Sequence, residues 1–325
     1  MRYQSASLIF PALVLLLTTP SVSLVAAPKS TPQTKAAAKP ADSTSDSANI
    51  GGEFASLQKR AKQNDPEALL QIGRAYLEGH IIAKDDAKAA ECFRKAADLG
   101  NWKAQNNVGL MYARGQGVEK DPELALKYLR QAATQGNMNA QENLAVMLLE
   151  GRELPKDLKE AMSWFEKAGS QGSRLSQHEL AYIYFFGRDD VKQDYALTAK
   201  WAKLAADQGD AWAQNTMGIL HQRGLGVEKD VKEAYKWFSL AAEQGDGMGQ
   251  GNLGLLIAHR VGGMPADKVS AYKWLFLGTE QGVAIAENAF KEYQNGLTGE
   301  ELFLAKQAIE EFKKSHPAPA TAKEQ

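Results

Sequence analysis

Apolar residues recur along most of this chain in two alternating patterns, and each pattern has the period of a helix. In the first pattern, three apolar residues follow one another in steps of four, as in Ala104, Val108 and Tyr112. A small residue comes directly after the middle one, here Gly109 after Val108. Steps of four place such residues on one side of a helix, and a small residue inside a helix indicates that a neighbouring backbone approaches there. The second pattern, seen between Ala125 and Ala133, follows the i, i+3, i+4, i+7, i+8 spacing of an amphipathic helix. The two patterns therefore predict a pair of helices that face a common core.

This pair of patterns repeats with a fixed period. Each second pattern ends on a glycine, and successive glycines are 36, 36, 37, 36 and 37 residues apart: Gly100, Gly136, Gly172, Gly209, Gly245 and Gly282. A fixed period of this size over six units is the sequence signature of a helical solenoid, in which each repeat packs on its neighbours. We therefore predict an all-α solenoid, in one elongated domain rather than the two globular domains that 325 residues would suggest. The predicted helix-turn-helix repeats are 65–100, 101–136, 137–172, 173–209, 210–245 and 246–282.

The segments between the paired helices contain the residues that end one helix and begin the next. The clearest examples are GQGVEKD, from Gly115 to Asp121, and GLGVEKD, from Gly224 to Asp230. Glycine accepts the positive φ at which a helix commonly ends, and aspartate accepts hydrogen bonds from the first N–H groups of a following helix. These segments therefore predict a short loop inside each repeat.

The complete repeat resembles the Sel1-like repeat, a relative of the tetratricopeptide repeat. The pattern AxxxLGxxYxxGxGVxxDxxxAxxWxxxAAxxG is seen here from Ala104 to Gly136 and from Ala213 to Gly245. The resemblance implies a right-handed superhelix of paired antiparallel helices that binds proteins or peptides and has no intrinsic catalysis, and we expect no cofactor. A cysteine-rich secreted branch of this family has regularly spaced disulfides. This chain, with Cys92 as its single cysteine, does not match that branch.

Both ends of the chain differ from the repeats. The apolar run from Leu8 to Leu17, followed by small and polar residues, predicts a secretory signal peptide over 1–27. Cleavage after Ser23, Ala26 or Ala27 is consistent with the sequence, and the alternative is an uncleaved membrane anchor. The signal peptide predicts export, to the periplasm or alternatively to the medium. Residues 28–52, rich in Ala, Pro, Ser, Thr and Lys, predict a disordered linker.

Further segments flank the repeats. Apolar spacing predicts a capping helix over 53–64 and capping helices over 283–316, with a capping box at Thr298 and Glu301. We expect a disordered tail at 317–325.

Charge and the remaining motifs exclude several classes of function. The 38 Lys and Arg against 39 Asp and Glu give a net charge of −1, which disfavours a nucleic-acid partner. The five histidines lie apart in the sequence, so we expect no metal site. Gly249 to Gly254 spells G-x-G-x-x-G, but this motif lies inside a predicted helix instead of between a strand and a helix, so we do not expect dinucleotide binding. Contact with a membrane is expected only through an uncleaved signal segment.

A candidate binding face follows from helix geometry. Counted from the first residue of each repeat, positions 4, 8, 11 and 12 of the first helix point to the core, and positions 3, 6, 10 and 13 point about 190° away. In the tetratricopeptide fold this side of the first helix lines a concave groove, and the resemblance implies the same here; position 14 is added to the face. The alternative is that these side chains pack against neighbouring repeats. The candidate residues are Arg74, Lys103, Asn106, Arg114, Glu142, His178, Tyr182, Phe185, Trp212, Asn215 and Arg223.

These observations favour an exported, non-enzymatic adaptor that binds a protein or an extended peptide in the groove. In this interpretation, Asn106, Asn215 and the arginines pair with the backbone and the carboxylates of the peptide. The alternative is a binding module for cell-wall fragments or another small polar ligand, held by stacking on Trp212 and Tyr182. A hydrolase ranks third, because no nucleophile and base are found to converge.

Overall fold

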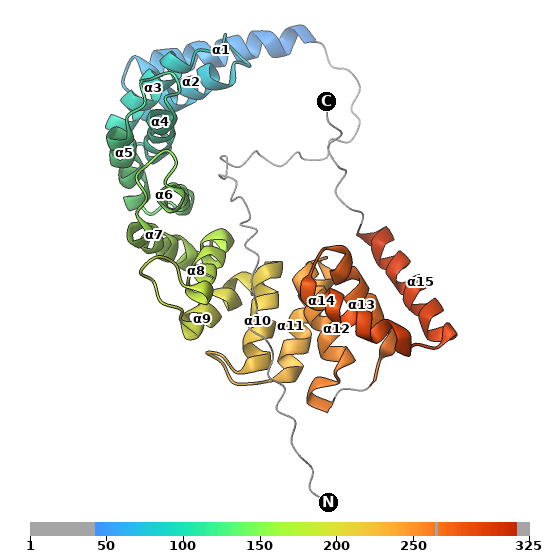
Figure 1. Ribbon diagram of the computed structural model, residues 1–325. Helices are drawn as coiled ribbons and strands as arrows, with labels where there is room; N and C mark the ends of the chain where they lie inside the picture. The colour runs from blue at the N-terminus through green and yellow to red at the C-terminus, as the bar shows by residue number, and fades with distance from the viewer. Residues whose placement is uncertain (1–42, 264–265, 317–325) are drawn as a thin grey trace, which may run out of the picture.

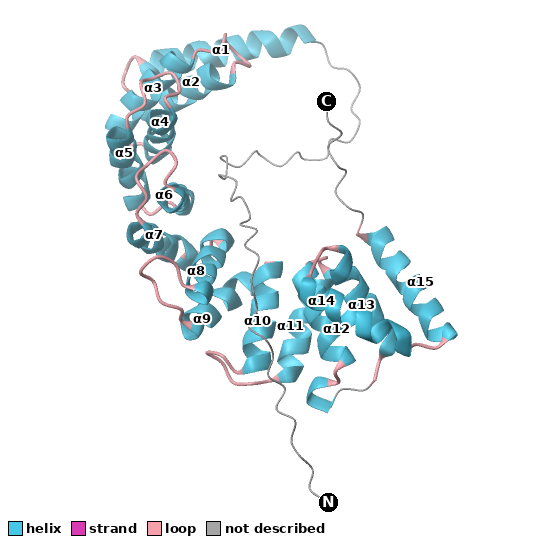
Figure 2. Ribbon diagram, in the orientation of Figure 1, coloured by secondary structure: helices cyan, strands magenta, loops and turns pink. Residues whose placement is uncertain are grey.

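The computed structural model describes residues 43–263 and 266–316, and these residues form helices and loops without a strand (Figure 2). The helices follow one another along an arc that is open on one side (Figure 1). The all-α solenoid predicted from the sequence is therefore confirmed. The predicted signal peptide over 1–27, the linker up to residue 42 and the tail over 317–325 lie outside the described residues.

Six pairs of helices form the repeats. The first helices of the pairs are α2 (Pro66–Glu78), α4 (Trp102–Arg114), α6 (Met138–Glu150), α8 (Arg174–Phe186), α10 (Ala211–Arg223) and α12 (Gly247–Ala258). The second helices are α3 (Asp86–Asp98), α5 (Pro122–Thr134), α7 (Leu158–Ser170), α9 (Tyr195–Asp207), α11 (Val231–Glu243) and α13 (Lys268–Glu280). Figure 1 shows α4, α6 and α8 on the inner side of the arc and α5, α7 and α9 on its outer side. The first helices therefore line the concave side, as the resemblance implies.

Polar caps and glycines set the limits of these helices. Asp121 caps α5 by accepting hydrogen bonds from the backbone N–H groups of Glu123 and Leu124, and Pro122 follows at the first helical position. Gly115 ends α4 in the left-handed conformation, with φ of 68°. The equivalent aspartates cap α3, α7, α9, α11 and α13 in the same way. The loop chemistry expected from the sequence is therefore present.

The small residue at position 9 lets the two helices of a repeat approach closely. A Cβ atom on Gly218 of α10 would lie 2.5 Å from the ring of Phe238 in α11, and one on Gly73 of α2 would lie 2.6 Å from the ring of Phe93 in α3. Both phenylalanines are fully buried. A large side chain on the second helix therefore fills the space that the first helix leaves empty, which accounts for a pattern that would otherwise lower helix propensity.

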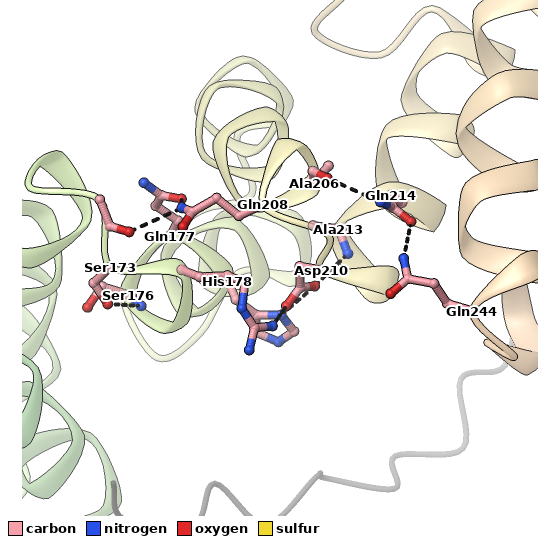
Figure 3. A network of polar contacts seen from close by, with 12 residues as sticks. Ser173, Ser176, Gln177, His178, Ala206, Gln208, Asp210, Ala213, Gln214 and Gln244 are labelled. Carbon is pink, nitrogen blue, oxygen red and sulfur yellow. Dashed lines mark hydrogen bonds and ion pairs between the residues drawn. The ribbon is translucent and has the colours of Figure 1, made fainter. Parts of the chain in front are cut away.

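Buried glutamines join each repeat to the one before it, and the sequence analysis missed them. Gln177 of α8 donates a hydrogen bond from Nε2 to the carbonyl oxygen of Gly169 in the last turn of α7, at 2.8 Å. Its Oε1 accepts a hydrogen bond from Nε2 of Gln208 at the end of α9, at 2.7 Å, and that amide also donates to the carbonyl of Gly172. Figure 3 shows this glutamine relay and the next one, formed by Gln214 and Gln244.

The glutamine relay occurs in repeats two to six. Its inner members are Gln105, Gln141, Gln177, Gln214 and Gln250, each at most 5% exposed. Its outer members are Gln135, Gln171, Gln208, Gln244 and Gln281. The first repeat carries Leu69 and Leu99 at the two equivalent positions. The two positions therefore change together within the chain, and this was the signal from which the relay could have been found.

Helices at both ends cap the solenoid. α1 (Ser43–Ala61) begins ten residues before the predicted cap, so the linker expected over 28–52 is helical from residue 43 onward. Residues 43–52 contain a single large apolar residue, Ile50, but a helix that is held at one end by packing extends along a chain that tolerates helix. At the other end, α14 (Ala284–Tyr293) is followed by η2 (Gln294–Gly296) and α15 (Gly299–Ser315), with the predicted capping box at Thr298 and Glu301.

The second glycine of the GxGV loops forms a contact between repeats. A Cβ atom on Gly226, in the loop after α10, would lie 2.3 Å from the carbonyl group of Tyr195 at the start of α9. Gly117 approaches Asp86 of α3 in the same way, at 2.2 Å. In the sixth repeat the corresponding loop contains the short helix η1 (Val261–Gly263).

Among the described residues, no helix combines the length and the apolar character that crossing a membrane requires.

We predict that Gly226→Ala lowers the free energy of unfolding by more than about 2 kcal/mol. The alanine must adopt a positive φ, and the backbone at Tyr195 must also move away from the added Cβ atom. Gly136→Ala is the matched control, since Gly136 also has a positive φ but open space around the added Cβ. It should cost only the ~1–2 kcal/mol of the left-handed conformation. Urea unfolding followed by circular dichroism measures both variants. Equal losses would contradict the inter-repeat contact.

Candidate functional site

Positions 3 and 10 of the first helices form the open line of the concave side, except in α6, where Val146 at position 10 is only 3% exposed. In the first repeat these positions hold the charged residues Glu67 and Arg74. In α8, α10 and α12 they are apolar and only half-buried, and we call these six side chains the concave apolar patch: Leu175, Tyr182, Trp212, Ile219, Met248 and Leu255. A contiguous apolar surface that the protein leaves partly open indicates a binding surface.

Aromatic side chains gather where α8 meets α10. The ring centroids of His178 and Trp212 lie 4.8 Å apart, and those of Tyr182 and Trp212 lie 5.5 Å apart. Phe186, at position 14, contacts Tyr182 at 4.7 Å and Phe185 at 4.8 Å. The structure therefore brings together four of the candidate residues, His178, Tyr182, Phe185 and Trp212, and adds Phe186 to them.

Positions 6 and 13 do not belong to the open face, and here the predicted face was too wide. Asn215 is 4% exposed and accepts a hydrogen bond from Asn252 of the next repeat at 2.8 Å. Asn106 accepts one from Asn143 at 3.3 Å. The hydroxyl of Ser173 donates to Glu142, which is 8% exposed. Position 6 turns toward the following repeat, so its polar groups connect repeats and are not free to bind a peptide backbone.

Phe185, at position 13, was also predicted to lie on the open face, and it does not. It packs against the main core cluster of the solenoid, and its ring meets those of Tyr195 at 6.0 Å and Trp212 at 6.2 Å. Tyr182, one turn earlier, is half-buried and is not among the side chains packed against that cluster. The alternative weighed in the sequence analysis, packing between repeats, therefore holds for Phe185 but not for Tyr182. It holds in part for Leu175 and Trp212 of the patch, which also pack against this cluster.

His178 is fixed by a polar contact with the next repeat. Its Nδ1 lies 3.0 Å from Oδ1 of Asp210, which is 8% exposed and also accepts the backbone N–H of Ala213 at the start of α10 (Figure 3). Arg174 adds an N–H donor to Oδ2 of Asp210 at 3.1 Å. Burial alone would raise the pKa of Asp210, but these donors and the charge of Arg174 hold that pKa below its ordinary value. Asp210 therefore stays ionised and orients His178 beside Trp212.

Glu179 is a second buried carboxyl group, and its pKa is shifted in the opposite direction to that of Asp210. It is 7% exposed, and none of the described residues donates a hydrogen bond to its carboxyl group. Burial raises the pKa of Glu179, and the nearby charges of His178 and Arg188 offset this effect only in part. The ionised form of Glu179 therefore lacks the partners that a buried charge requires.

The basic candidates remain accessible. Arg74, Arg114 and Arg223 are exposed, and within the described residues none of them has an ion-pair partner. The ammonium group of Lys103 lies 5.7 Å from the ring of Trp102. These four residues lie on three helices of three different repeats, α2, α4 and α10, so they do not form one cluster with the aromatic residues.

The described residues offer no place for a metal, since they contain no group of three or more His, Cys, Asp or Glu side chains that could hold one. The G-x-G-x-x-G motif lies within α12, where Asp246 caps the N–H of Gly249. Its glycines accommodate packing: a Cβ atom on Gly254 would lie 2.8 Å from Leu275 of α13. This motif therefore serves contact between helices.

The fold and the concave apolar patch define a class of repeat protein, the α-solenoids whose first helices line a concave surface. The sequence pattern of the Sel1 repeat matches residues 66–101, 102–137, 139–173, 174–210, 213–246 and 248–283. The chain belongs to the Sel1 repeat family, a family of scaffolds that are generally modules for protein interaction.

Solved structures with a similar fold include the following two. A Sel1 repeat protein from Oxalobacter formigenes is 26% identical, with a TM-score of 0.60 over 83% of this chain and 81% of that one. A protective antigen present in uropathogenic Escherichia coli strains, which displays an SLR fold, is 24% identical, with a TM-score of 0.50 over 84% of this chain and 68% of that one. Both likenesses concern the fold. None of the curated proteins compared with this chain matches it.

We predict that the two neighbouring aromatics respond differently to truncation. Tyr182→Ala should lower the free energy of unfolding by about 1 kcal/mol or less, because it removes a half-open side chain. Phe185→Ala should cost more, and Phe165→Ala, which empties a fully buried site in α7, should cost about 3–5 kcal/mol. Thermal and urea unfolding give the ranking. If Tyr182→Ala is as destabilising as Phe165→Ala, then Tyr182 is a core residue.

We also predict a pH-dependent gain in stability for Glu179→Gln. Because the folded state raises the pKa of Glu179, its carboxyl group costs stability as the pH rises from about 4.5. The variant should therefore be more stable than the unmodified protein at pH 7, and the difference should disappear below about pH 4.5. Urea midpoints between these pH values measure the effect.

Glu160→Gln is the matched control for this measurement. Arg130 donates two hydrogen bonds to Glu160, at 2.8 and 2.6 Å, and lowers its pKa. This variant should therefore lose stability at pH 7 and match the unmodified protein only in acid. A loss of stability at pH 7 in Glu179→Gln as well would show that Glu179 has a stabilising partner.

Proposed function

We propose that the protein is an exported, non-enzymatic adaptor that binds a protein or an extended peptide through the concave side of its solenoid. The observation that carries this proposal is the concave apolar patch. Its six side chains come from three successive first helices, and they stay half-open although the same helices bury Leu180, Leu220 and Leu253 almost completely. Proteins of this family are generally interaction modules, which agrees with a partner at this surface.

The arrangement of polar groups supports binding without catalysis. The candidate acid and base at the patch, Asp210 and His178, are bound to each other and to the end of α10. A hydrolytic site needs a nucleophile within reach of such a base. The hydroxyl group of Ser173, which caps the start of the helix that carries His178, donates to Glu142. These side chains hold adjacent repeats in register.

The proposal of export rests on the sequence. The apolar run from Leu8 to Leu17 is typical of a signal peptide, and the periplasm is the compartment we propose, with release to the medium as the alternative. Cys92 is the single cysteine of the chain, so folding requires no intramolecular disulfide in either compartment.

Photo-crosslinking in intact cells tests both parts of the proposal. A benzophenone amino acid is placed at Tyr182 on the concave side or at Tyr235 of α11, an aromatic residue on the outer layer that is 38% exposed. We expect a discrete protein adduct from position 182 and none from position 235, in the periplasmic fraction. Equal adducts from both positions would contradict the concave site, and an adduct confined to the cytoplasm at full chain length would contradict export.

A further inference from the structure

The three helices that carry the concave apolar patch expose positive charge and no carboxylate. Apart from histidines, the charged residues of α8, α10 and α12 are Arg174, Glu179 and Arg223. Both arginines are exposed, whereas Glu179 is only 7% exposed. The capping carboxylates of α10 and α12, Asp210 and Asp246, accept backbone N–H groups. The charge that these helices offer to a partner is therefore basic.

The two guanidinium groups lie at opposite edges of the patch. Arg174 is the first residue of α8 and Arg223 is the last residue of α10, so they belong to opposite ends of adjacent first helices. The side chain of Arg174 is 55% exposed and uses one N–H group on Asp210, which leaves other donors free. Arg223 has no ion-pair partner within the part of the chain that the structure describes. Each edge therefore offers donors that match the geometry of a carboxylate.

The size of the patch sets the length of the segment that fits it. Helices α8 and α10 have 13 residues each, and a helix of that length is about 20 Å long, so the helix ends that carry Arg174 and Arg223 are roughly this far apart along the helix axes. An extended chain advances about 3.3 Å per residue and covers this distance with about six residues. Tyr182 and Trp212 belong to the same two helices, and their ring centroids lie 5.5 Å apart.

We propose that the patch binds an acidic and apolar peptide segment, in which aromatic or aliphatic side chains rest on Tyr182 and Trp212 and flanking Asp or Glu residues pair with Arg223 and Arg174. This inference rests on the proposed function and adds to it the chemical class of the partner. The apolar contacts supply most of the affinity, and the arginines select a negatively charged segment over a positively charged one.

Synthetic peptides test this class directly. Fluorescein-labelled peptides of about ten residues carry a central Leu-Tyr-Leu core, which covers the roughly six-residue span with flanks on both sides. In the first peptide the flanks are Glu, in the second they are Lys, and in the third the Glu flanks are kept while Ser replaces the core. Fluorescence anisotropy with the full-length chain at low salt should show the first peptide binding at least about tenfold tighter than either of the others.

Two variants and one control connect this preference to the patch. Arg223→Glu should weaken binding of the Glu-flanked peptide about tenfold and improve binding of the Lys-flanked one. Lys232→Glu, the same change of charge at an exposed residue of α11, should leave both affinities unchanged. Trp212→Ala should weaken every peptide that contains the apolar core.

The possible contrary results separate this inference from the proposed function. If the Lys-flanked peptide binds as tightly as the Glu-flanked one and both depend on Trp212, the acidic class is wrong and the concave site stands. If Arg223→Glu and Lys232→Glu have equal effects, the charge selection is general and not local, and the inference is also wrong. If binding is independent of Trp212, or if no peptide binds, the inference fails, and the crosslinking pattern at Tyr182 decides the concave site separately.

Discussion

The stacking of this solenoid depends on satisfying the backbone carbonyls that each new repeat buries. The last turn of a second helix has carbonyl groups without the usual helical partners, and the next repeat covers them. At the junction of repeats three and four, Gln177 reaches the carbonyl of Gly169, and Gln208 fixes the amide of Gln177 in turn. A buried polar group without a hydrogen bond lowers the stability of the fold. These hydrogen bonds therefore form in only one relative placement of the helices. Five such relays set the register of the whole arc.

A fixed register decides which face of each first helix remains open. With the relay on one side and the polar contacts of position 6 on the other, each first helix has neighbours on both flanks, and only a narrow line remains between them. Asn215 lies on the covered side of this line, where Asn252 of the next repeat holds it. Tyr182 lies on the open line. Helix geometry alone assigned positions 3, 6, 10 and 13 to this face. In the stacked protein only positions 3 and 10 remain on it.

The fourth repeat is where the solenoid departs from its own pattern. At position 6 of other repeats, Asn106 and Asn215 join repeats through amide contacts and Glu142 accepts a hydrogen bond from Ser173. In the fourth repeat His178 at this position meets Asp210 and Trp212 instead. Phe185 and Phe186 add bulk at the same junction. The repeat keeps its glutamine relay, so the change affects the concave surface and not the stacking. Variation at the surface of an otherwise regular scaffold is how repeat proteins acquire distinct partners.

The sequence by itself determined the helices, their pairing and their number. The four-residue steps around Val108, the small residues such as Gly109 and the cap at Asp121 are local features, and local geometry is enough to interpret them. Only the tertiary structure decided what flanks each helix. Asn106 and Phe185 were predicted to face a groove. Asn106 instead meets Asn143 of the next repeat, 37 positions away, and Phe185 packs against the core, because no local period predicts contacts between residues so far apart. The extent of α1 was decided in the same way, since packing at its end extends a helix that composition alone does not predict.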